Sequence, residues 1–248
     1  MASSSSSSAC KACNEPLILK VSAEESETGE ETAVPDDLAL SCGCHFHWQC
    51  LLDQAAEVTV SLQCPSCGAT LASSAQGGAP ISTRYINEGG VQEGLDILPA
   101  LTEEAYLSTN PKARPARALH VMVAEGDVAG IVALLADVDS NPEAGVTSME
   151  LLPWTDPLNG GRSALHVAIE AQQQEVFWLL LWLGSKAPVQ LFPVTVVEAS
   201  EEMELKRNVS AIVTDVRTVK DESGRKPSRA CYQQGEPWVS YVEGGLFD

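Results

Sequence analysis

The chain lacks a membrane-spanning segment, and it has little positive charge. Its apolar stretch at residues 176–183 is far shorter than the roughly 20 residues that cross a bilayer. Lys and Arg number 15 against 34 Asp and Glu, giving a net charge of −19. A nucleic-acid partner needs a basic face for its phosphates. We therefore expect neither a membrane nor a nucleic acid among the partners.

The first nine residues also lack the features of a secretory signal. They are a Ser-rich tract with no basic region and no apolar core. With nothing to bury, residues 1–9 are expected to be disordered. Paired cysteines without a secretion signal indicate metal ligands in a reducing compartment, not disulfides. We expect a cytoplasmic or nuclear protein.

Potential metal ligands are concentrated in the first 70 residues. Seven of the eight cysteines and one histidine form four pairs: Cys10 and Cys13, Cys42 and Cys44, His47 and Cys50, Cys64 and Cys67. A pair two or three residues apart can hold one face of a Zn²⁺ ion, and two pairs complete a tetrahedral site. Four pairs predict two closed structural zinc sites, with no position left for a catalytic water.

Composition divides the rest of the N-terminal half. We expect a zinc module over residues 10–70, and inside it residues 22–37 carry seven carboxylates and no cation. Such a block repels itself and is expected to be a solvated, flexible loop. Residues 71–112 are expected to be a linker. It begins with a Ser- and Gly-rich stretch at 73–80 and contains one short helix around residues 95–106.

An internal repeat begins near residue 113. The tetrapeptide Ala-Leu-His-Val occurs at residues 118–121 and again at 164–167, which is 46 positions later. Apolar residues at i, i+3 and i+4 after each copy predict a short helix, a tight turn and a second helix. A degenerate third copy starts near residue 222. Residues 113–248 are therefore expected to be an all-α array of helix pairs.

This array resembles ankyrin repeats, whose motif is T-P-L-H-x-A with a period of 33 residues. Copy one is RALHVM at 117–122, copy two SALHVA at 163–168, and copy three KPSRAC at 226–231. The starts lie 46 and then 63 residues apart, so insertions are expected at 141–158 and 188–221. The second contains an amphipathic stretch, 194–205, that predicts an extra helix. The resemblance implies that His120 and His166 bond turn backbone, and that the array binds a protein substrate.

The segment LSCGCHFHWQCL at residues 40–51, with Cys-Pro-Ser-Cys at 64–67, resembles a RING finger. The resemblance implies a small α+β cross-braced fold with a helix from about residue 50 to 59. It assigns one ion to Cys10, Cys13, His47 and Cys50, and the other to Cys42, Cys44, Cys64 and Cys67. Most RING fingers have His where this chain has Cys44, and the adjacent His45 is an alternative ligand.

RING ubiquitin ligases hold a ubiquitin-charged conjugating enzyme (E2) in a reactive conformation, which is catalysis by positioning. The residues at the corresponding E2-binding positions are Ala12, Gln54, Pro65, Ser66 and Gly68. Ala12 replaces a larger aliphatic residue, Gln54 a common Trp, and Gly68 a basic residue. The main hypothesis is a RING-type E3 ligase whose array selects the substrate. The alternatives are a non-enzymatic zinc-finger and ankyrin adaptor, and a chromatin-reading PHD-like module with the same ligand order but a different spacing.

Overall fold

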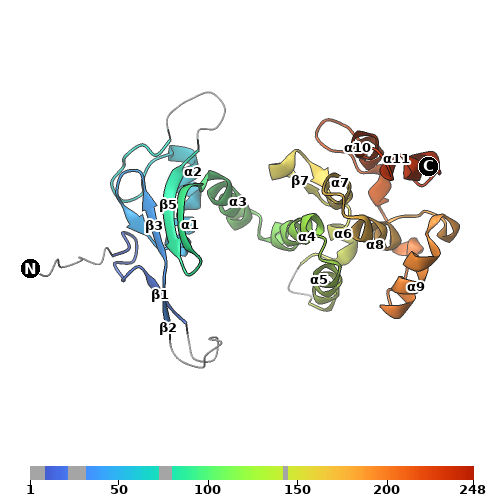
Figure 1. Ribbon diagram of the computed structural model, residues 1–248, viewed down its shortest axis with the longest axis horizontal. Coiled ribbons are helices and arrows are strands. Elements are labelled where there is room, and N and C mark those ends of the chain that lie inside the picture. The colour runs from blue at the N-terminus through green and yellow to red at the C-terminus, as the bar shows by residue number, and fades with distance from the viewer. Residues whose placement is uncertain (1–8, 22–31, 73–79, 142–144) are drawn as a thin grey trace, which may run out of the picture. The chain divides into compact units, whose positions relative to one another are not determined.

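The computed structural model describes residues 9–21, 32–72, 80–141 and 145–248. It divides into two compact units, Met1–Thr109 and Asn110–Asp248 (Figure 1). Three expectations fall wholly or mainly outside the described residues: the disordered N-terminus, most of the acidic loop and the stretch at 73–79. Ala9, the last residue of the expected N-terminal tail, forms a β-bridge with Pro16.

The first unit combines three antiparallel strand pairings in one sheet with a separate hairpin and three helices. Its elements are β1 (Ile18–Val21), β2 (Thr32–Pro35), β3 (Asp37–Leu40), β4 (His45–Phe46), α1 (Trp48–Leu52), α2 (Ala55–Ser61), β5 (Ser82–Asn87), β6 (Gly90–Asp96) and α3 (Leu98–Thr109). Strands β1 and β2 pair with each other, and the sheet has the order β4-β3-β5-β6.

The expected linker at 71–112 is wrong for most of its length, because it supplies two strands of the main sheet and a helix. Strand β5 pairs with β3, from Asp37 opposite Ile86 to Leu40 opposite Thr83. The β-branched and aromatic residues of β5 favour a strand. Gly90, with φ of 115°, starts β6 directly after the turn. The metal-ligand segment and this hairpin are thus one domain.

The acidic loop is also shorter than expected. Residues 32–35 are strand β2, paired with β1, and Asp37 begins β3. Asp36, between them, is only 2% exposed. Its carboxylate accepts hydrogen bonds from the Trp48 backbone N–H at 3.1 Å and from the Tyr85 hydroxyl at 3.0 Å. Asp36 therefore joins β5 to the start of α1, where a carboxylate satisfies an otherwise unpaired helix N–H.

The single helix expected at 50–59 is two short helices, α1 and α2, separated by Asp53 and Gln54. Leu51, Ala55 and Val58 point into the core with Phe46 and Leu38. Helix α3, three residues later than the helix expected at 95–106, packs against α2. Leu101 of α3 is fully buried in the same core, so α3 completes the first unit.

The second unit is mainly helical. Its helices and strands are α4 (Arg114–Glu125), α5 (Val128–Ser140), α6 (Ser148–Leu151), β7 (Thr155–Asp156), β8 (Arg162–Ser163), α7 (Ala164–Glu170), α8 (Gln174–Gly184), α9 (Val194–Glu202), α10 (Pro227–Gln234) and α11 (Trp238–Glu243). Short 3₁₀ turns are η1 (Pro111–Ala113), η3 (Pro157–Asn159), η4 (Val189–Leu191), η5 (Val209–Ala211) and η6 (Val216–Thr218).

The three sequence copies each form a pair of helices: α4 with α5, α7 with α8, and α10 with α11. Helix α7 packs against both α4 and α10, which puts the three pairs in one stack (Figure 1). The turn of the first pair follows from its sequence. Gly126 ends α4 with φ of 79°, and the Asp127 carboxylate accepts the Gly130 N–H at 2.8 Å to cap α5.

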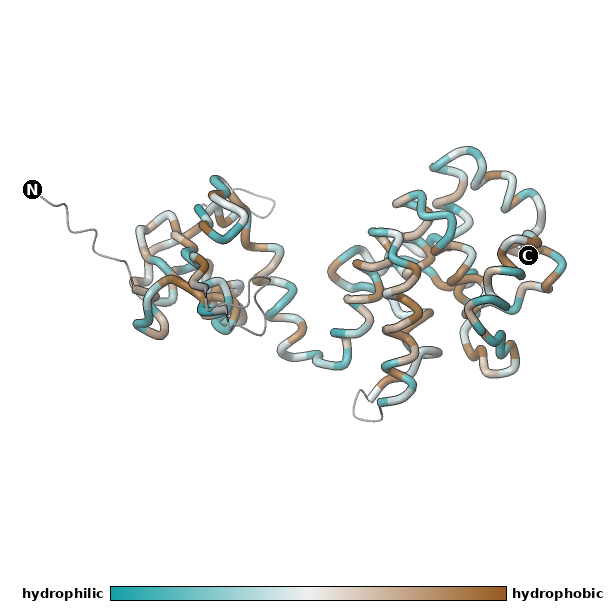
Figure 2. The backbone as a smooth tube through the Cα atoms, turned by 60° about the horizontal axis from the view of Figure 1, so that its bottom comes forward, coloured by the Kyte–Doolittle hydropathy of each residue, from teal (hydrophilic) through white to brown (hydrophobic). Residues whose placement is uncertain are grey.

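The expected insertions carry their own structure. The first contains α6 and strand β7, which pairs with β8, so the unit is not strictly all-α. The second contains α9 within the amphipathic stretch 194–205, as predicted. Figure 2 shows hydrophobic and hydrophilic positions alternating along the helices of this unit. No helix in the described ranges is both long and apolar enough to cross a membrane.

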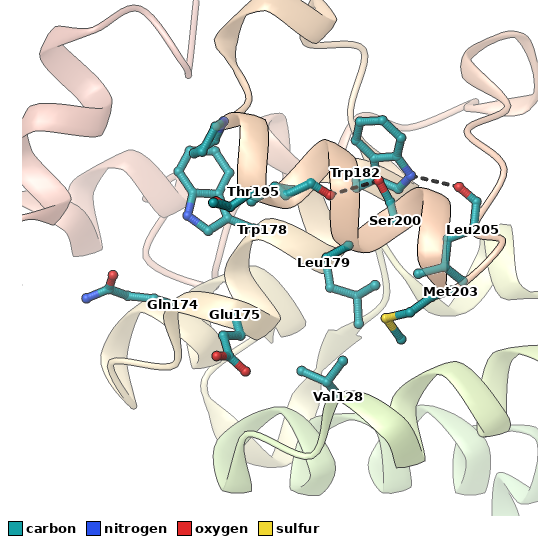
Figure 3. A pocket seen from close by; sticks show the side chains of 13 residues that line it. Val128, Gln174, Glu175, Trp178, Leu179, Trp182, Thr195, Ser200, Met203 and Leu205 are labelled. Carbon is teal, nitrogen blue, oxygen red and sulfur yellow. Dashed lines mark hydrogen bonds between the residues drawn. The ribbon is translucent and has the colours of Figure 1, made fainter.

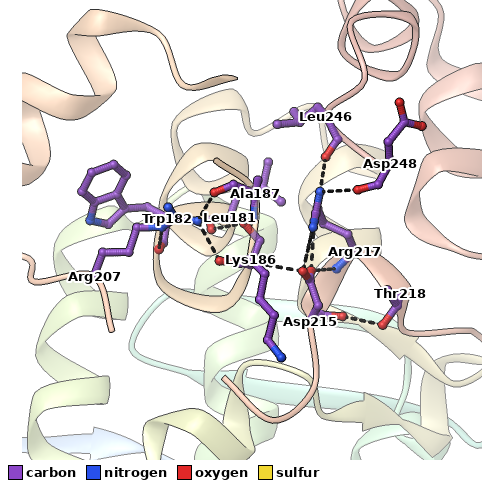
Figure 4. Close-up of polar contacts among 11 residues, drawn as sticks. Leu181, Trp182, Lys186, Ala187, Arg207, Asp215, Arg217, Thr218, Leu246 and Asp248 are labelled. Atoms are coloured by element: carbon purple, nitrogen blue, oxygen red, sulfur yellow. Dashed lines mark hydrogen bonds and ion pairs between the residues drawn. The ribbon is translucent and has the colours of Figure 1, made fainter. Parts of the chain in front are cut away.

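Two arginines fix the second insertion to the stack (Figure 4). Arg207 donates to the carbonyls of Trp182 at 3.1 Å and Ser185 at 2.7 Å. Arg217 is 8% exposed, pairs with Asp215 at 2.8 Å and donates to the Leu246 carbonyl, beyond the insertion, at 2.8 Å. Burial disfavours the Asp215 carboxylate, but the Arg217 hydrogen bonds outweigh it and lower the Asp215 pKa. Polar contacts therefore hold the second insertion, residues 188–221, in place in addition to apolar packing.

The two repeat histidines differ. His166 has its Nε2 3.1 Å from the Arg225 carbonyl and its Nδ1 2.8 Å from the Ser163 hydroxyl, so it bonds turn backbone as predicted. His120 is 5% exposed, and neither ring nitrogen has a hydrogen-bond partner among the described residues. Its ring packs edge-on against Trp154, with 5.1 Å between centroids. The predicted bond from His120 to turn backbone is therefore absent at hydrogen-bond geometry, although the Trp154 backbone is close enough to oppose the lowering of the His120 pKa.

Burial makes His120 an acid-sensitive point of the stack. It lowers the His120 pKa from 6.5 to about 4, so the unfolded chain binds the proton first as pH falls. The part of the unfolding free energy that depends on a neutral His120 is fully present above about pH 6.5. It is lost as the pH falls towards 4. We expect His120→Met to reduce the loss of unfolding free energy between pH 7 and pH 5 by about 2 kcal/mol. Urea titrations of parent and variant at both pH values measure this, and an unchanged loss would contradict it.

Candidate metal centre

Cysteine and histidine side chains of the first unit gather into two groups of four. One contains Cys10, Cys13, His47 and Cys50, and the other Cys42, Cys44, Cys64 and Cys67. Within each group, all potential ligand atoms lie within 4.8 Å of one another. The first and third pairs along the chain form one group, and the second and fourth form the other. The groups are therefore interleaved, as a cross-brace requires.

In the first group, His47 directs one ring nitrogen at the cysteines. Its Nδ1 lies 3.3 Å from Cys13 Sγ and 3.7 Å from Cys50 Sγ. A nitrogen and a sulfur on one tetrahedral zinc ion are about 3.6 Å apart, from Zn–N and Zn–S lengths near 2.05 and 2.3 Å. His47 Nε2 is 2.9 Å from the Pro16 carbonyl, to which it donates its proton. That bond leaves the Nδ1 lone pair free to coordinate.

Tight turns present the cysteines of the second group. Cys42 and Cys44 lie in the turn between β3 and β4, where Gly43 has φ of 81°. Cys64 and Cys67 follow α2, and the Cys64 carbonyl accepts the Gly68 N–H at 2.8 Å. Gly68 also has a left-handed φ of 72°, a conformation that costs a non-glycine residue about 1–2 kcal/mol. These turns hold both thiols of each pair on one side of the backbone.

The choice between Cys44 and His45 follows from the direction of the two side chains. Cys44 lies with the second group and is 9% exposed. His45 is the first residue of β4, and its Nδ1 is 2.6 Å from the Asp37 carboxylate. His45 is thus engaged by Asp37, and its ring lies outside both groups of potential ligands. Cys44 is the candidate ligand.

Two thiols of the first group, Cys10 and Cys50, differ in acidity. Burial disfavours the Cys10 thiolate, but backbone N–H groups of Cys13, His47 and Ala12 outweigh it and lower the Cys10 pKa to about 6. Burial and the neighbouring sulfurs of Cys10 and Cys13 raise the Cys50 pKa to about 12. One thiolate thus forms readily and suppresses the next, a repulsion that a bound cation removes.

The second group repeats this pattern. The Ala69 N–H and the neighbouring Cys64 sulfur lower the Cys67 pKa to about 7, while burial and the surrounding sulfurs raise the Cys44 pKa to about 12. Cys231, the remaining cysteine, is buried in the second unit, where burial raises its pKa to about 12. It takes no part in either group.

The residues expected to contact an E2 lie around the metal-ligand turns. Ala12, Ser66 and Gly68 are exposed, and Pro65 is half-buried. Gln54 is half-buried, and its side-chain amide donates to the Cys50 carbonyl at 3.0 Å. Gln54 therefore stabilises the junction of α1 and α2, a role that the sequence did not reveal.

Sequence reasoning missed the polar residues that support the ligand frame. Asp36 and Asp37 were assigned to the solvated loop, yet they bind Trp48, Tyr85 and His45. Their position next to alternating apolar residues 38 and 40 was a signal that a strand begins there. Burial and the Asp36 carboxylate raise the Tyr85 pKa to about 12. Tyr85 thus stays a hydrogen-bond donor across the physiological range.

No protein-family model, curated protein or solved structure matches this chain. Seven sulfurs and one imidazole nitrogen in two closed sets of four define two candidate metal-binding sites.

The purified chain is expected to bind two metal ions, measured by native mass spectrometry and elemental analysis. Cys44→Ser should bind one ion, because the second group then offers only three ligands. His45→Ala is the matched control: it removes the adjacent side chain and should keep both ions. One ion in the parent chain, or loss of an ion from His45→Ala alone, would contradict the assignment.

Chelation should unfold the first unit and spare the second. The two sites are expected to supply folding free energy on the order of 10 kcal/mol per ion. Hydrogen exchange of the full chain with a strong chelator should show lost amide protection over residues 9–109, strands β5 and β6 included. Protection of α7 and α8 should persist. Retained protection of β5 and β6 would show that this hairpin folds without the metal sites.

Proposed function

We propose that the chain is a RING-type E3 ubiquitin ligase with two structural zinc ions and an ankyrin-like substrate-binding array. The supporting observation is the interleaving of the two groups. The first ligand pair, Cys10 and Cys13, groups with the third pair, His47 and Cys50, and the second pair lies between them in the sequence. A cross-braced finger has this connectivity. A finger built from two sequential sites would join the first pair to the second.

Zinc is the metal proposed for both sites. A Cys₃His set and a Cys₄ set in closed form are the donor sets of structural zinc. Thiolate donors disfavour Mg²⁺ and Ca²⁺, which take oxygen ligands. The ions would fold the first unit, and they leave no open position for a metal-bound water.

The ligase would act by positioning an E2 that carries ubiquitin, without forming a covalent intermediate of its own. Its proposed contact residues are Ala12, Gln54, Pro65, Ser66 and Gly68. These residues offer an E2 little side-chain contact area. Ala12 has one methyl group, and the Gln54 amide is hydrogen-bonded to the Cys50 carbonyl. We therefore propose activity that is weak in isolation or that depends on a partner.

The second unit would provide specificity. Stacked helix pairs expose turns and helix faces that recognise proteins. The helix pairs α4/α5, α7/α8 and α10/α11 form such a stack. The alternative proposal is a non-enzymatic adaptor, in which zinc folds the first unit and both units bind proteins. The small contact area that the proposed E2-binding residues offer favours this alternative.

Ubiquitin discharge from a panel of charged E2 enzymes tests the ligase proposal. We expect slow discharge with the parent chain and a rise of about tenfold with Ala12→Ile and Gln54→Trp combined. The added apolar area is worth roughly 0.8 kcal/mol per buried methylene. Ser82→Ile, at an exposed site on β5, is the matched control and should leave the rate unchanged.

Gly68→Arg tests the missing basic residue separately, because its φ of 72° adds strain to the variant. Metal content reports whether that variant still folds. If the parent and the double variant are both inert with every E2, the adaptor proposal holds. Full activity in the parent would leave the ligase proposal intact and show that the assigned contact residues are wrong.

A further inference from the structure

The second unit contains an apolar groove between α8 and α9 (Figure 3). Its main cavity has a volume of about 430 Å³, within the range of ligand sites. Leu179 from α8, Val128 from α5 and Met203 after α9 point towards one another there. Trp178 and Trp182 form the wall on the α8 side. A second hollow shares Trp182, Ser200 and Leu205 with the first, so the groove continues towards Lys206.

The groove is held open by contacts that do not need an occupant. Trp182 Nε1 donates to the Leu205 carbonyl at 3.0 Å, which fixes the indole against the chain after α9. Arg207 lies over the Trp182 ring at 5.5 Å and bonds the backbone behind it (Figure 4). The Ser200 hydroxyl donates to the Val196 carbonyl at 2.8 Å. The indole N–H of Trp182 and the hydroxyl of Ser200 are thus already paired, so these two residues offer an occupant mainly apolar surface.

The wall structure restricts the backbone of any bound peptide. Most of the lining comes from α8 and α9, whose backbone groups are largely used within the helices. An extended peptide would find few backbone partners in this groove, and unpaired backbone groups are costly to bury. A helix satisfies its own backbone and offers apolar residues at i, i+3, i+4 and i+7. The groove therefore favours a helical occupant.

The charges at the rim of the groove favour a positively charged helix over a negatively charged one. Glu175 lines the main cavity, and Glu201 and Glu204 line the adjoining hollow, against one rim cation, Lys206, among the lining residues. The whole chain carries a net charge of −19. Carboxylates around an apolar centre attract a partner with Lys or Arg beside its apolar residues. A second copy of this acidic chain would be repelled.

We propose that the α8–α9 groove binds a basic amphipathic helix of a partner protein. The partner's apolar residues would enter between Leu179 and Met203, and its cations would face Glu175, Glu201 and Glu204. The inference rests on the proposed role of the second unit in binding a protein. Peptide binding is measured without E2 or ubiquitin, so failure of the ligase proposal and failure of this one are separate results.

A displayed library of 16-residue peptides, selected on the full metal-loaded chain, tests the proposal. We expect enriched peptides with helical apolar spacing and net positive charge. In fluorescence polarisation, their affinity should fall at least about tenfold for Met203→Glu, which places a carboxylate in the apolar centre. Glu201→Lys with Glu204→Lys should weaken binding about threefold or more and remove most of its salt dependence.

Val213→Glu and Glu243→Lys are the matched controls, because both alter exposed positions of the second unit outside the groove lining. Both should bind the peptides like the parent. Circular dichroism confirms that each variant is folded. No enrichment, enriched peptides that are acidic or lack helical spacing, or equal affinity for Met203→Glu would overturn the proposal. A parent that self-associates and a Met203→Glu variant that is monomeric in sedimentation would assign the groove to a second copy.

Discussion

The structure of the first unit depends on bringing eight ligand side chains from four separate segments of the chain into two small volumes. Cys10 and Cys13 form one group with His47 and Cys50. The pairs at 42–44 and 64–67 form the other, so the two groups alternate along the chain. Within each group, burial and the neighbouring sulfurs oppose the ionisation of one thiol, Cys50 in the first and Cys44 in the second. A cation in each group removes this cost. The same ions would fix the relative positions of β3, β4 and α2, which carry or flank the ligands.

A second set of interactions joins this ligand frame to the sheet. Asp36 binds the start of α1 and the hydroxyl of Tyr85, while Trp48 and Tyr85 rings lie 5.1 Å apart. Strand β5 is therefore part of the metal-binding domain, although it follows the last ligand by fifteen residues (67 to 82). Asp36, Trp48 and Tyr85 thus link β5 to α1, the helix that carries Cys50.

The sequence predicted what short-range spacing determines and missed what depends on distant pairing. Ligand pairs, the repeated Ala-Leu-His-Val and the α9 helix are local patterns, and each has its counterpart in the structure. Strand β5 forms by pairing with β3, which begins 45 residues earlier (37 to 82), and β6 forms by pairing with β5. Without those partners, a polar, Gly-containing segment resembled a linker. His120 shares its motif with His166, but its neighbours differ: an indole replaces the carbonyl that His166 finds.

X-ray absorption at the zinc edge of the metal-loaded chain tests the central claim most directly, because it reports the atoms bound to the ions. The two groups contain seven sulfurs and one nitrogen. Divided over two ions, this predicts an average first shell of about 3.5 sulfurs at about 2.3 Å and about 0.5 nitrogen at about 2.05 Å. A Cys44→Ser chain, expected to keep only the ion of the first group, should show about three sulfurs and one nitrogen around that ion. A shell with two or more oxygen or nitrogen ligands per ion would contradict two closed, interleaved sites.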